Sequence, residues 1–209
     1  IADPRLRLIS QQNRGLTSTL NRMLKEARTP WLMRLDADDI CFPERVERTI
    51  EYIKRYPSAG MFYSRALHYQ DGKTAGLLRN TEGTPAQLRA MANAGYLFSI
   101  CHSSVTLNTQ KVLAEGGYRY DLYIEDLDLW WRMALNHDIV LIPEPLAGYR
   151  INENSICTSK ANELAINTLF VQYLLVSYLT RREPLPHEVV RERLVPLMDS
   201  RYVEYQASM

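Results

Sequence analysis

The chain has 209 residues, and its 25 Lys and Arg side chains nearly balance 24 Asp and Glu, giving a formal net charge of +1 at pH 7. At roughly 150 residues per domain, this length favours one domain with at most a small appendage. The 46% hydrophobic and 23% charged residues are ordinary globular values and argue against a disordered chain, while the near-zero net charge argues against nucleic acid as a partner. The three cysteines form no C-x-x-C pair, and no apolar run reaches the roughly 20 residues of a membrane-spanning helix.

The first part of the chain carries alternating strand and helix patterns. Residues 5–10 alternate as a half-buried strand does, and apolar residues recur at the spacing of one helical face over residues 16–27. Residues 31–35 form a second predicted strand, which runs into the acidic turn Asp36-Ala-Asp-Asp39. Another helix follows, with a predicted buried face at Val46, Ile50 and Ile53. This order of elements favours an α/β domain with parallel strand pairing.

Turn and capping signals place the remaining elements. Asp71-Gly72 is a hairpin signal, and Thr84-Pro85 is typical of a helix N-cap with proline in the first turn. Pro143 and Pro145 are expected to close a short buried strand. In chain order, the predicted elements are strands at 60–69 and 74–79, a helix at 84–93, an extended segment at 100–107, a short helix from Thr109 to Gly116, a helix at 125–134, a strand at 139–142 and helices at 161–180 and 186–198.

Two carboxylates, Asp36 and Asp38, lie two positions apart at the end of a predicted strand. If the turn is extended, they point the same way at the carboxyl edge of the sheet, which is where open α/β sheets bind ligands. A hard ion such as Mg2+ takes few protein oxygens and completes its shell with water and substrate phosphates. The pair therefore suits a divalent metal, although a solvated loop with Asp39 as the cap of the next helix gives the same pattern.

Glu125-Asp126 is a second acidic pair, at the start of a predicted helix. Acids at that position are common because they complement the helix dipole. A carboxylate apart from the metal could also take a proton from an incoming hydroxyl group. The residue pattern is compatible with both roles.

Several stretches of the chain form a series in fixed order and spacing. They are Asn13-Arg-Gly15, Trp31-Leu-Met-Arg-Leu-Asp-Ala-Asp-Asp39 with Pro43-Glu-Arg-Val46, His102-Ser-Ser-Val105, Gly116-Gly-Tyr118 through Ile124-Glu-Asp-Leu-Asp-Leu-Trp130, and Gly148-Tyr-Arg-Ile151. Together they are far more specific than any one motif. Over residues 1–155 the chain resembles glycosyltransferase family 2.

The resemblance implies an α/β fold of the GT-A type over residues 1–158, a mixed sheet flanked by helices, with a C-terminal helical extension over 159–209. It implies an inverting glycosyltransferase that moves a sugar from a nucleotide-diphosphate sugar donor, of UDP or GDP type, to a hydroxyl of a saccharide or lipid-linked acceptor. Mg2+ or Mn2+ would stabilise the charge that builds on the departing nucleoside diphosphate. Polysaccharide biosynthesis is the process to which such an enzyme belongs.

The resemblance also assigns roles to residues of this sequence. Asp38 would hold the metal, Asp36 would reach the ribose or the metal, and Asp126 would be the general base that deprotonates the acceptor hydroxyl. The residues expected to bind the donor are Asn13, Gly15, Asp36 and Arg150, and those expected on the acceptor side are Glu125, His102 and Trp130.

The chain departs from the family pattern in two places. Members of the family begin with a strand–helix–strand unit that is not found here, and Asn152 stands where GT-A enzymes often have a metal-assisting histidine. The alternative expectation is a truncated, non-catalytic remnant that serves as a scaffold or partner-binding domain. The expected location is the cytoplasm. The C-terminal helices are expected to pack on the domain, while peripheral contact with the inner face of the membrane and a homodimer stay open.

Overall fold

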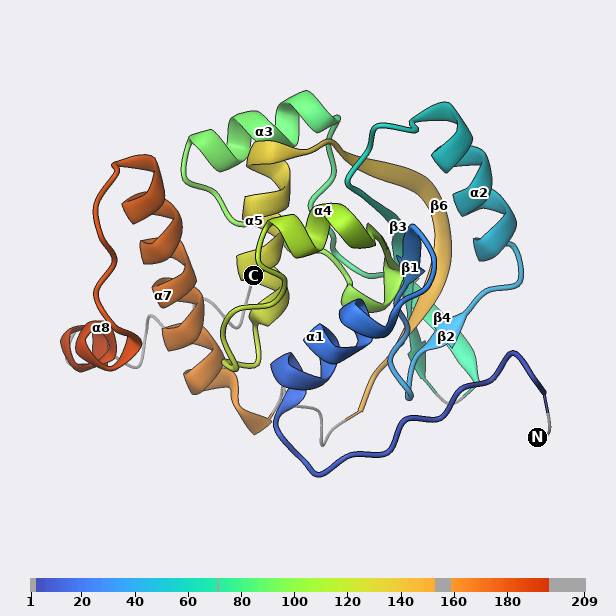
Figure 1. Cartoon of the computed structure of the whole chain (residues 1–209), viewed down its shortest axis with the longest axis horizontal. Coiled ribbons are helices and arrows are strands. Elements are labelled where there is room, and N and C mark those ends of the chain that lie inside the picture. The colour runs from blue at the N-terminus through green and yellow to red at the C-terminus, as the bar shows by residue number, and fades with distance from the viewer. Residues whose placement is uncertain (1–2, 71, 153–158, 196–209) are drawn as a thin grey trace.

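A six-stranded mixed sheet forms the centre of the computed structural model, which describes residues 3–70, 72–152 and 159–195. The strand order is β1-β5-β3-β6-β2, with β4 paired to β3, so β1 and β2 lie at opposite edges (Figure 1). β3 and β6 are parallel and the other pairs are antiparallel. The parallel pairing expected for the first strands is wrong, because β1 takes the antiparallel β5 as its neighbour. The strands are β1 (Trp31–Met33), β2 (Ile40–Cys41), β3 (Met61–Gln70), β4 (Lys73–Leu77), β5 (Val105–Asn108) and β6 (Ile139–Arg150).

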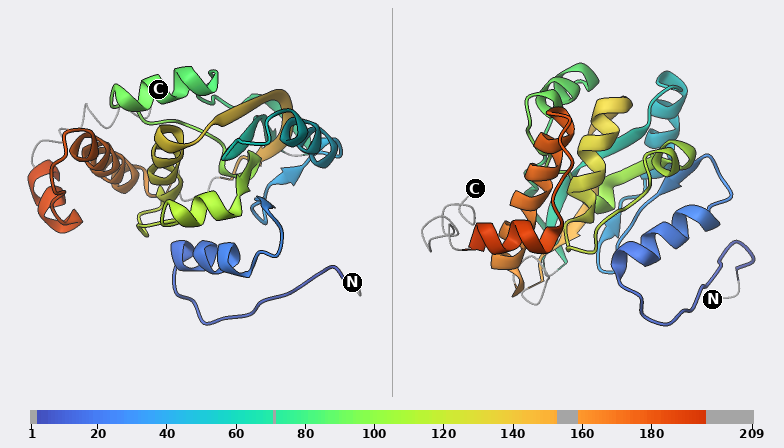
Figure 2. Two further views of the ribbon diagram at one scale, coloured as in Figure 1. Left: turned by 45° about the horizontal axis from the view of Figure 1, so that its top comes forward. Right: turned by 60° about the vertical axis from the view of Figure 1, so that its left-hand side comes forward.

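Helices cover both faces of this sheet. On one face, Tyr52 and Ile53 of α2 pack on Phe62 and Val140 of the central strands. On the other face, a larger hydrophobic cluster joins the sheet to the remaining helices, and α5 lies between α7 and the sheet (Figures 1 and 2). The helices are α1 (Leu16–Glu26), α2 (Arg45–Arg55), α3 (Pro85–Asn93), the 3-10 turn η1 (His102–Ser104), α4 (Thr109–Ala114), α5 (Glu125–Asn136), α7 (Ala161–Leu179) and α8 (His187–Leu194).

Local signals placed several elements correctly. At α3, the Thr84 hydroxyl accepts from the Gln87 amide and the Thr84 amide donates to the Gln87 side chain, which is the capping box that precedes many helices. β3 and β4 form the expected antiparallel pair. α4 is capped by Asn108, one residue before the predicted Thr109.

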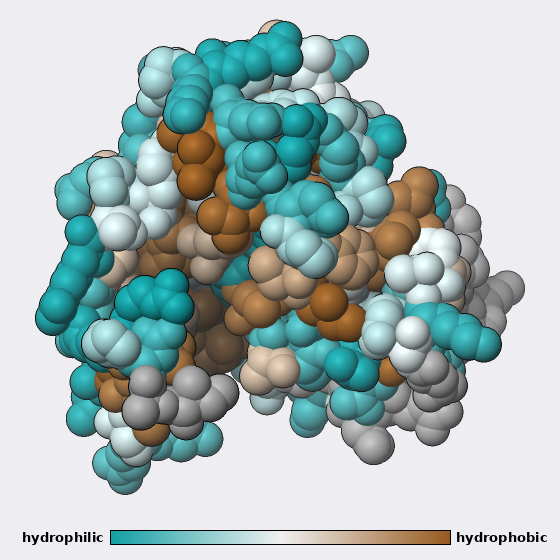
Figure 3. Space-filling model, turned by 90° about the vertical axis from the view of Figure 1, so that its right-hand side faces the viewer, coloured by the Kyte–Doolittle hydropathy of each residue, from teal (hydrophilic) through white to brown (hydrophobic). Residues whose placement is uncertain are grey.

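Residues 5–10 do not form a strand, although their sequence alternates. A strand persists only where a neighbour takes its backbone hydrogen bonds, and no strand in the described part of the chain pairs with this segment. Leu6 and Leu8 are consequently exposed, at 63% and 96%. Figure 3 shows hydrophobic side chains gathered along a hollow on this side of the molecule.

β6 is longer than predicted, because it continues from Ile139 to Arg150 through Pro143 and Pro145. Its register against β3 shifts on both sides of Arg65. Such irregularities provide positions at which a residue without a backbone N–H does not break the ladder. The added length brings the end of β6 to the acidic turn.

The buried face of α2 also differs from the prediction. Val46 and Ile50 are exposed, at 53% and 45%, whereas Arg45 and Thr49 are buried. Arg45 Nη2 donates to the backbone carbonyls of Arg34 and Val105, which offsets part of the cost of burying the guanidinium. A buried arginine with backbone acceptors therefore sets the rotation of α2.

The C-terminal helices α7 and α8 pack on the rest of the fold. Phe170 and Leu175 of α7 and Val190 of α8 belong to the hydrophobic cluster that α5 and the sheet share. This agrees with the expected helical extension. Residues 196–198 of the last predicted helix lie outside the described residues. No helix in the described ranges is long and apolar enough to cross a membrane.

Candidate active site

An open cavity of about 600 Å³ lies where the acidic turn after β1 meets the start of α5. Its wall also includes the segment after β4, the residues around η1 and the end of β6. The two acidic elements that the sequence singled out are both on this cavity, which is lined by Asp36, Asp38, Asp39, Glu125 and Asp126. The fold therefore brings together carboxyl groups that are about 90 residues apart in the chain.

Asp36 is held by a buried arginine. Both of its carboxylate oxygens accept from the Arg34 guanidinium, at 2.5 and 2.6 Å, and the Ser103 hydroxyl donates to one of them at 3.2 Å. The Arg34 side chain is only 6% exposed, and its backbone amide donates to the Val105 carbonyl. Arg34 and Ser103 thus fix the orientation of Asp36 from two sides.

Asp38 is exposed on the cavity wall, and its carboxylate makes no hydrogen bond or ion pair within the described ranges. Arg150 instead binds the backbone of this turn, because its Nε donates to the Asp38 carbonyl at 2.6 Å. The Arg150 amide donates to Asp39 Oδ1 at 2.9 Å. Asp39 is therefore tied to β6 and does not cap α2, whose N-cap residue is Glu44. Burial raises the pKa of Asp39.

Glu125 and Asp126 open α5 at the edge of the same cavity. Burial raises the pKa of Asp126 to about 6, and burial together with the neighbouring Asp126 charge raises the pKa of Glu125 to about 7. Asp126 Oδ1 accepts from the Leu127 amide at 2.8 Å. Glu125 Oε2 is buried and has no hydrogen-bond partner among the residues described. A carboxylate whose pKa lies near neutrality is suited to accept a proton from a hydroxyl group.

His102 lines the cavity next to this pair, and its Nε2 lies 2.8 Å from the Tyr118 hydroxyl. Burial and the nearby Arg34 charge lower the pKa of His102 well below its usual value, so the ring is neutral. Trp130, which was expected on the acceptor side, does not line the cavity. It is fully buried beneath His102, with its ring edge-on to the imidazole, because it belongs to the core face of α5.

Asn13 and Gly15 shape the start of α1 and do not line the acidic cavity. The Asn13 side chain accepts from the Gly15 amide at 3.0 Å. Gly15 has a φ of +84°, and a Cβ atom at this position would overlap the Asp121 carboxylate. Any other residue would be strained at this φ and would displace the Asp121 carboxylate. The next residue, Leu16, does line the cavity, so the turn lies at its rim.

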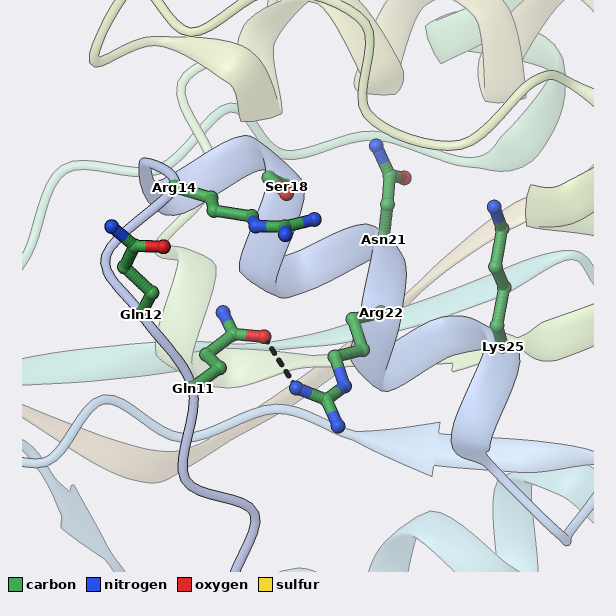
Figure 4. A pocket seen from close by; sticks show the side chains of 7 residues that line it. All are labelled: Gln11, Gln12, Arg14, Ser18, Asn21, Arg22 and Lys25. Atoms are coloured by element: carbon green, nitrogen blue, oxygen red, sulfur yellow. Dashed lines mark hydrogen bonds between the residues drawn. The ribbon is translucent and has the colours of Figure 1, made fainter.

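A second recess, of about 580 Å³, lies between residues 11–14 and the outer side of α1 (Figure 4). Arg14, Arg22 and Lys25 give its wall a positive charge, and Arg22 donates to the Gln11 side chain at 2.7 Å. Its lining residues include no carboxylate, thiol or imidazole that could move a proton or attack a substrate. The acidic cavity is therefore the better candidate for the active site.

The acidic cavity fits a hard divalent cation that is bound largely through the substrate. Within the described ranges, no group of three His, Cys, Asp or Glu side chains could hold a metal ion without other ligands. Mg2+ needs only one or two protein carboxylates when phosphate and water oxygens complete its shell. Asp38 offers a free carboxylate for this purpose, whereas both oxygens of Asp36 are engaged by Arg34.

The cavity residues that the sequence did not single out include Arg34, Ser103 and Tyr123. Arg34 could have been predicted, because residues two positions apart in an extended segment share a face and Asp36 follows Arg34 at that spacing. Ser103 belongs to the stretch His102-Ser-Ser-Val105, in which His102 is the more obvious candidate for a functional residue. Nothing in the sequence around Tyr123 indicates a site residue, because its backbone φ of +61° is set by the surrounding fold.

The fold that carries this site is that of a GT-A glycosyltransferase. The structure is similar to the crystal structure of TarS from S. aureus in complex with UDP-GlcNAc, with a TM-score of 0.60 and 13% sequence identity. The match covers 87% of this chain and 51% of that chain. The expected mixed sheet with flanking helices is confirmed.

Residues 1–117 match the family model described as glycosyl transferase family 2, and the chain belongs to this family. It is 29% identical over 148 residues to the amylovoran biosynthesis glycosyltransferase AmsE of Erwinia amylovora, covering 70% of this chain and 54% of the relative. It is 25% identical over 158 residues to the putative glycosyltransferase EpsE of Bacillus subtilis, covering 71% and 50%. The chain spans about half the length of these curated relatives.

Proposed function

We propose that this chain carries the core of an inverting glycosyltransferase, which moves a sugar from a nucleotide-diphosphate donor to a hydroxyl of a saccharide or lipid-linked acceptor. The observation that supports this most is that the free carboxylate of Asp38 and the raised-pKa carboxyl of Asp126 line one cavity. The UDP-GlcNAc complex of the structural neighbour and the amylovoran biosynthesis relative favour a nucleotide-sugar donor and a polysaccharide product. In this proposal residues 1–158 form the catalytic unit and residues 159–209 its helical extension.

In the proposed reaction, Asp126 takes the proton of the acceptor hydroxyl. With a pKa of about 6 it is ionised at neutral pH and still basic enough to share that proton in the transition state. The acceptor oxygen then attacks the anomeric carbon on the face opposite the leaving nucleoside diphosphate, so the configuration inverts without a covalent enzyme intermediate. Asp38 would hold a divalent cation, which would supply positive charge for the departing diphosphate. Arg34 and Ser103 keep Asp36 turned to the cavity for the ribose or the cation.

Calorimetric titration with UDP and with GDP, in the presence and absence of Mn2+, tests the donor site. The expected result is metal-dependent binding of one nucleotide, which Asp38→Ala abolishes. Glu47→Ala removes an exposed carboxylate on α2 and serves as the matched control that should bind normally. If the folded wild-type chain binds neither nucleotide, the alternative of a non-catalytic scaffold or partner-binding domain gains support.

The base assignment has a separate test. Asp126→Asn should bind the nucleotide as tightly as the wild type and should lose sugar transfer, because the amide cannot accept the proton. Transfer by this variant at the wild-type rate would refute the assignment.

A further inference from the structure

Tyr123 is held in a backbone conformation that few side chains adopt. Its φ is +61°, and Arg181 is the one other non-glycine residue with positive φ in the described ranges. Such residues carry strain, and they cluster at active sites and ligand clamps, where the surrounding fold enforces them. Tyr123 stands two positions before Glu125 and lines the acidic cavity. Its unusual backbone is therefore located at the candidate site.

The fold fixes both neighbours of Tyr123. On one side, the Leu122 carbonyl accepts from the side-chain amide of Asn167 in α7, at 2.8 Å. On the other side, Ile124 is buried, and its carbonyl accepts from the Leu127 amide in the first turn of α5. These contacts hold the backbone in place while the side chain of Tyr123 stays at the surface.

The Tyr123 side chain itself is 43% exposed. Within the described part of the chain, its ring makes no aromatic or cation–π contact and its hydroxyl makes no hydrogen bond. Tyr149 also lines the cavity, but its ring packs edge-on against His68. Tyr123 thus presents an exposed aromatic ring on a fixed backbone, and among the described residues this ring is engaged by no other ring, cation or hydrogen bond.

We propose that the Tyr123 ring is a stacking platform for the pyranose ring of the acceptor, so that the acceptor is a cyclic saccharide. The proposal rests on the proposed function, because it takes Asp126 as the base that must reach the acceptor hydroxyl. The C–H face of a pyranose is apolar and flat, and it suits an aromatic face, while its hydroxyls suit the polar walls of the cavity. A lipid alcohol or an open-chain polyol offers no such face.

Saturation-transfer NMR with methyl β-glycosides of glucose, galactose, N-acetylglucosamine and mannose tests the platform without requiring turnover, and sorbitol serves as the open-chain probe. Wild type and Tyr123→Phe should bind at least one glycoside with similar affinity, because stacking uses the ring and not the hydroxyl. Tyr123→Ala and Tyr123→Gly should bind it about tenfold more weakly. Tyr96→Ala removes another exposed tyrosine, outside the cavity lining, and should bind as the wild type does.

Thermal unfolding of the same variants separates binding from folding. Glycine adopts positive φ without strain, so Tyr123→Gly should melt at or above the wild-type temperature and still lose the glycoside. The proposal is overturned by unchanged glycoside binding in Tyr123→Gly, by a much lower melting temperature of that variant, by equal binding of sorbitol and glycosides, or by no glycoside binding to the wild type.

Nucleotide titration of the same samples distinguishes the two proposals. If nucleotide binding is absent while the glycoside binds through Tyr123, the proposed function fails and the platform stands as a saccharide-binding site. If nucleotide binding depends on Asp38 while glycoside binding ignores Tyr123, the platform alone fails.

Discussion

Arg34 places a buried positive charge beside a cavity that is lined by five carboxyl groups. It binds Asp36 directly, and its charge opposes the rise that burial causes in the pKa of Glu125 and Asp126. Without it, the neighbouring carboxyl groups would bind protons more readily, because like charges in a confined site disfavour ionisation. A single arginine therefore helps to keep the acidic site ionised near neutral pH.

Loss of this arginine should destabilise the fold measurably. Arg34→Ala removes a charged hydrogen-bond partner from Asp36 and should cost about 1–3 kcal/mol in urea unfolding. The comparison is Arg89→Ala, which removes an ion pair to Asp138 whose side chains are 39% and 45% exposed. That variant should lose less than about 1 kcal/mol. Equal losses in the two variants would show that burial of Arg34 contributes little.

Asp126 should make stability fall as pH rises. Burial raises its pKa from 3.8 to about 6, so between these values the folded chain keeps a proton that the unfolded chain has released. The stabilising contribution is full below about pH 4 and is lost as pH rises through about 6. Asp126→Asn removes this loss and should gain about 1–3 kcal/mol relative to wild type between about pH 5 and pH 8. Urea midpoints across this range give the measurement, and parallel curves for the two proteins would contradict it.

At the scale of single residues, the sequence pointed to acidic side chains and a histidine, whose chemical roles can be inferred from residue type. Asp36, Asp38, Glu125, Asp126 and His102 all line the cavity, as two acidic elements and one motif suggested. Trp130 could not be placed from the sequence, because whether an aromatic residue faces a cavity or the core depends on the rotation of α5. That rotation is decided by packing against other elements.

α1 begins against the loop that leads to α5. Gly15 has positive φ, its missing side chain leaves room for the Asp121 carboxylate, and that carboxylate accepts from the Thr17 amide at 3.4 Å. The glycine of the Asn13-Arg-Gly15 stretch is thus favoured by its positive φ and by the position of the Asp121 carboxylate. This preference holds whether or not the turn touches a donor.

Two glycines provide a matched test of this packing. Gly15→Ala combines backbone strain with overlap on Asp121, whereas Gly76→Ala, at a φ of +111°, meets open space. Strain alone should cost about 1–2 kcal/mol, and displacing the Asp121 carboxylate from the Thr17 amide should add about 0.5–1.5 kcal/mol at Gly15. Urea unfolding of both variants measures the difference. A loss at Gly15 no larger than that at Gly76 would mean that the loop moves aside at little cost.

At the scale of elements, local signals located the helices and several strands, but they did not decide which strand patterns persist or how long a strand is. α3 follows from its capping box alone. In contrast, residues 5–10 have a strand pattern without a partner, and β6 runs through two prolines because its register shifts against β3. Strand identity depends on neighbours that are distant in the sequence, so no local rule could supply it.

A hydrogen bond joins the C-terminal helices to the loop that leads to the candidate site. Asn167 of α7 is 1% exposed, its amide donates to the Leu122 carbonyl, and its oxygen lies 3.1 Å from His187 Nε2 in α8. The extension therefore supports the loop that carries Tyr123. The proposed division into residues 1–158 and 159–209 follows the order of the chain. The hydrophobic cluster contains residues from both parts.

Asn167→Ala should consequently act at a distance. It leaves the partly buried Leu122 carbonyl without its partner, which should cost about 1 kcal/mol in urea unfolding. It should also weaken glycoside binding, because the loop before Glu125 loses its support. Asn93→Ala, an exposed asparagine on α3, is the control. If Asn167→Ala binds glycosides as the wild type does, the loop holds its shape without α7.

Residues 34–39, which include the acidic turn, join the two outermost strands of the sheet, β1 and β2. Hydrogen bonds hold this segment at several positions. Its backbone or side chains bind Val105 and Ser103 on one side and Arg150 on the other. Asp38 lies between these attachments, so the backbone freedom that a loop residue would lose on binding has already been removed by folding. A ligand that binds Asp38 meets a preorganised backbone, so the ordering of this loop reduces the affinity little.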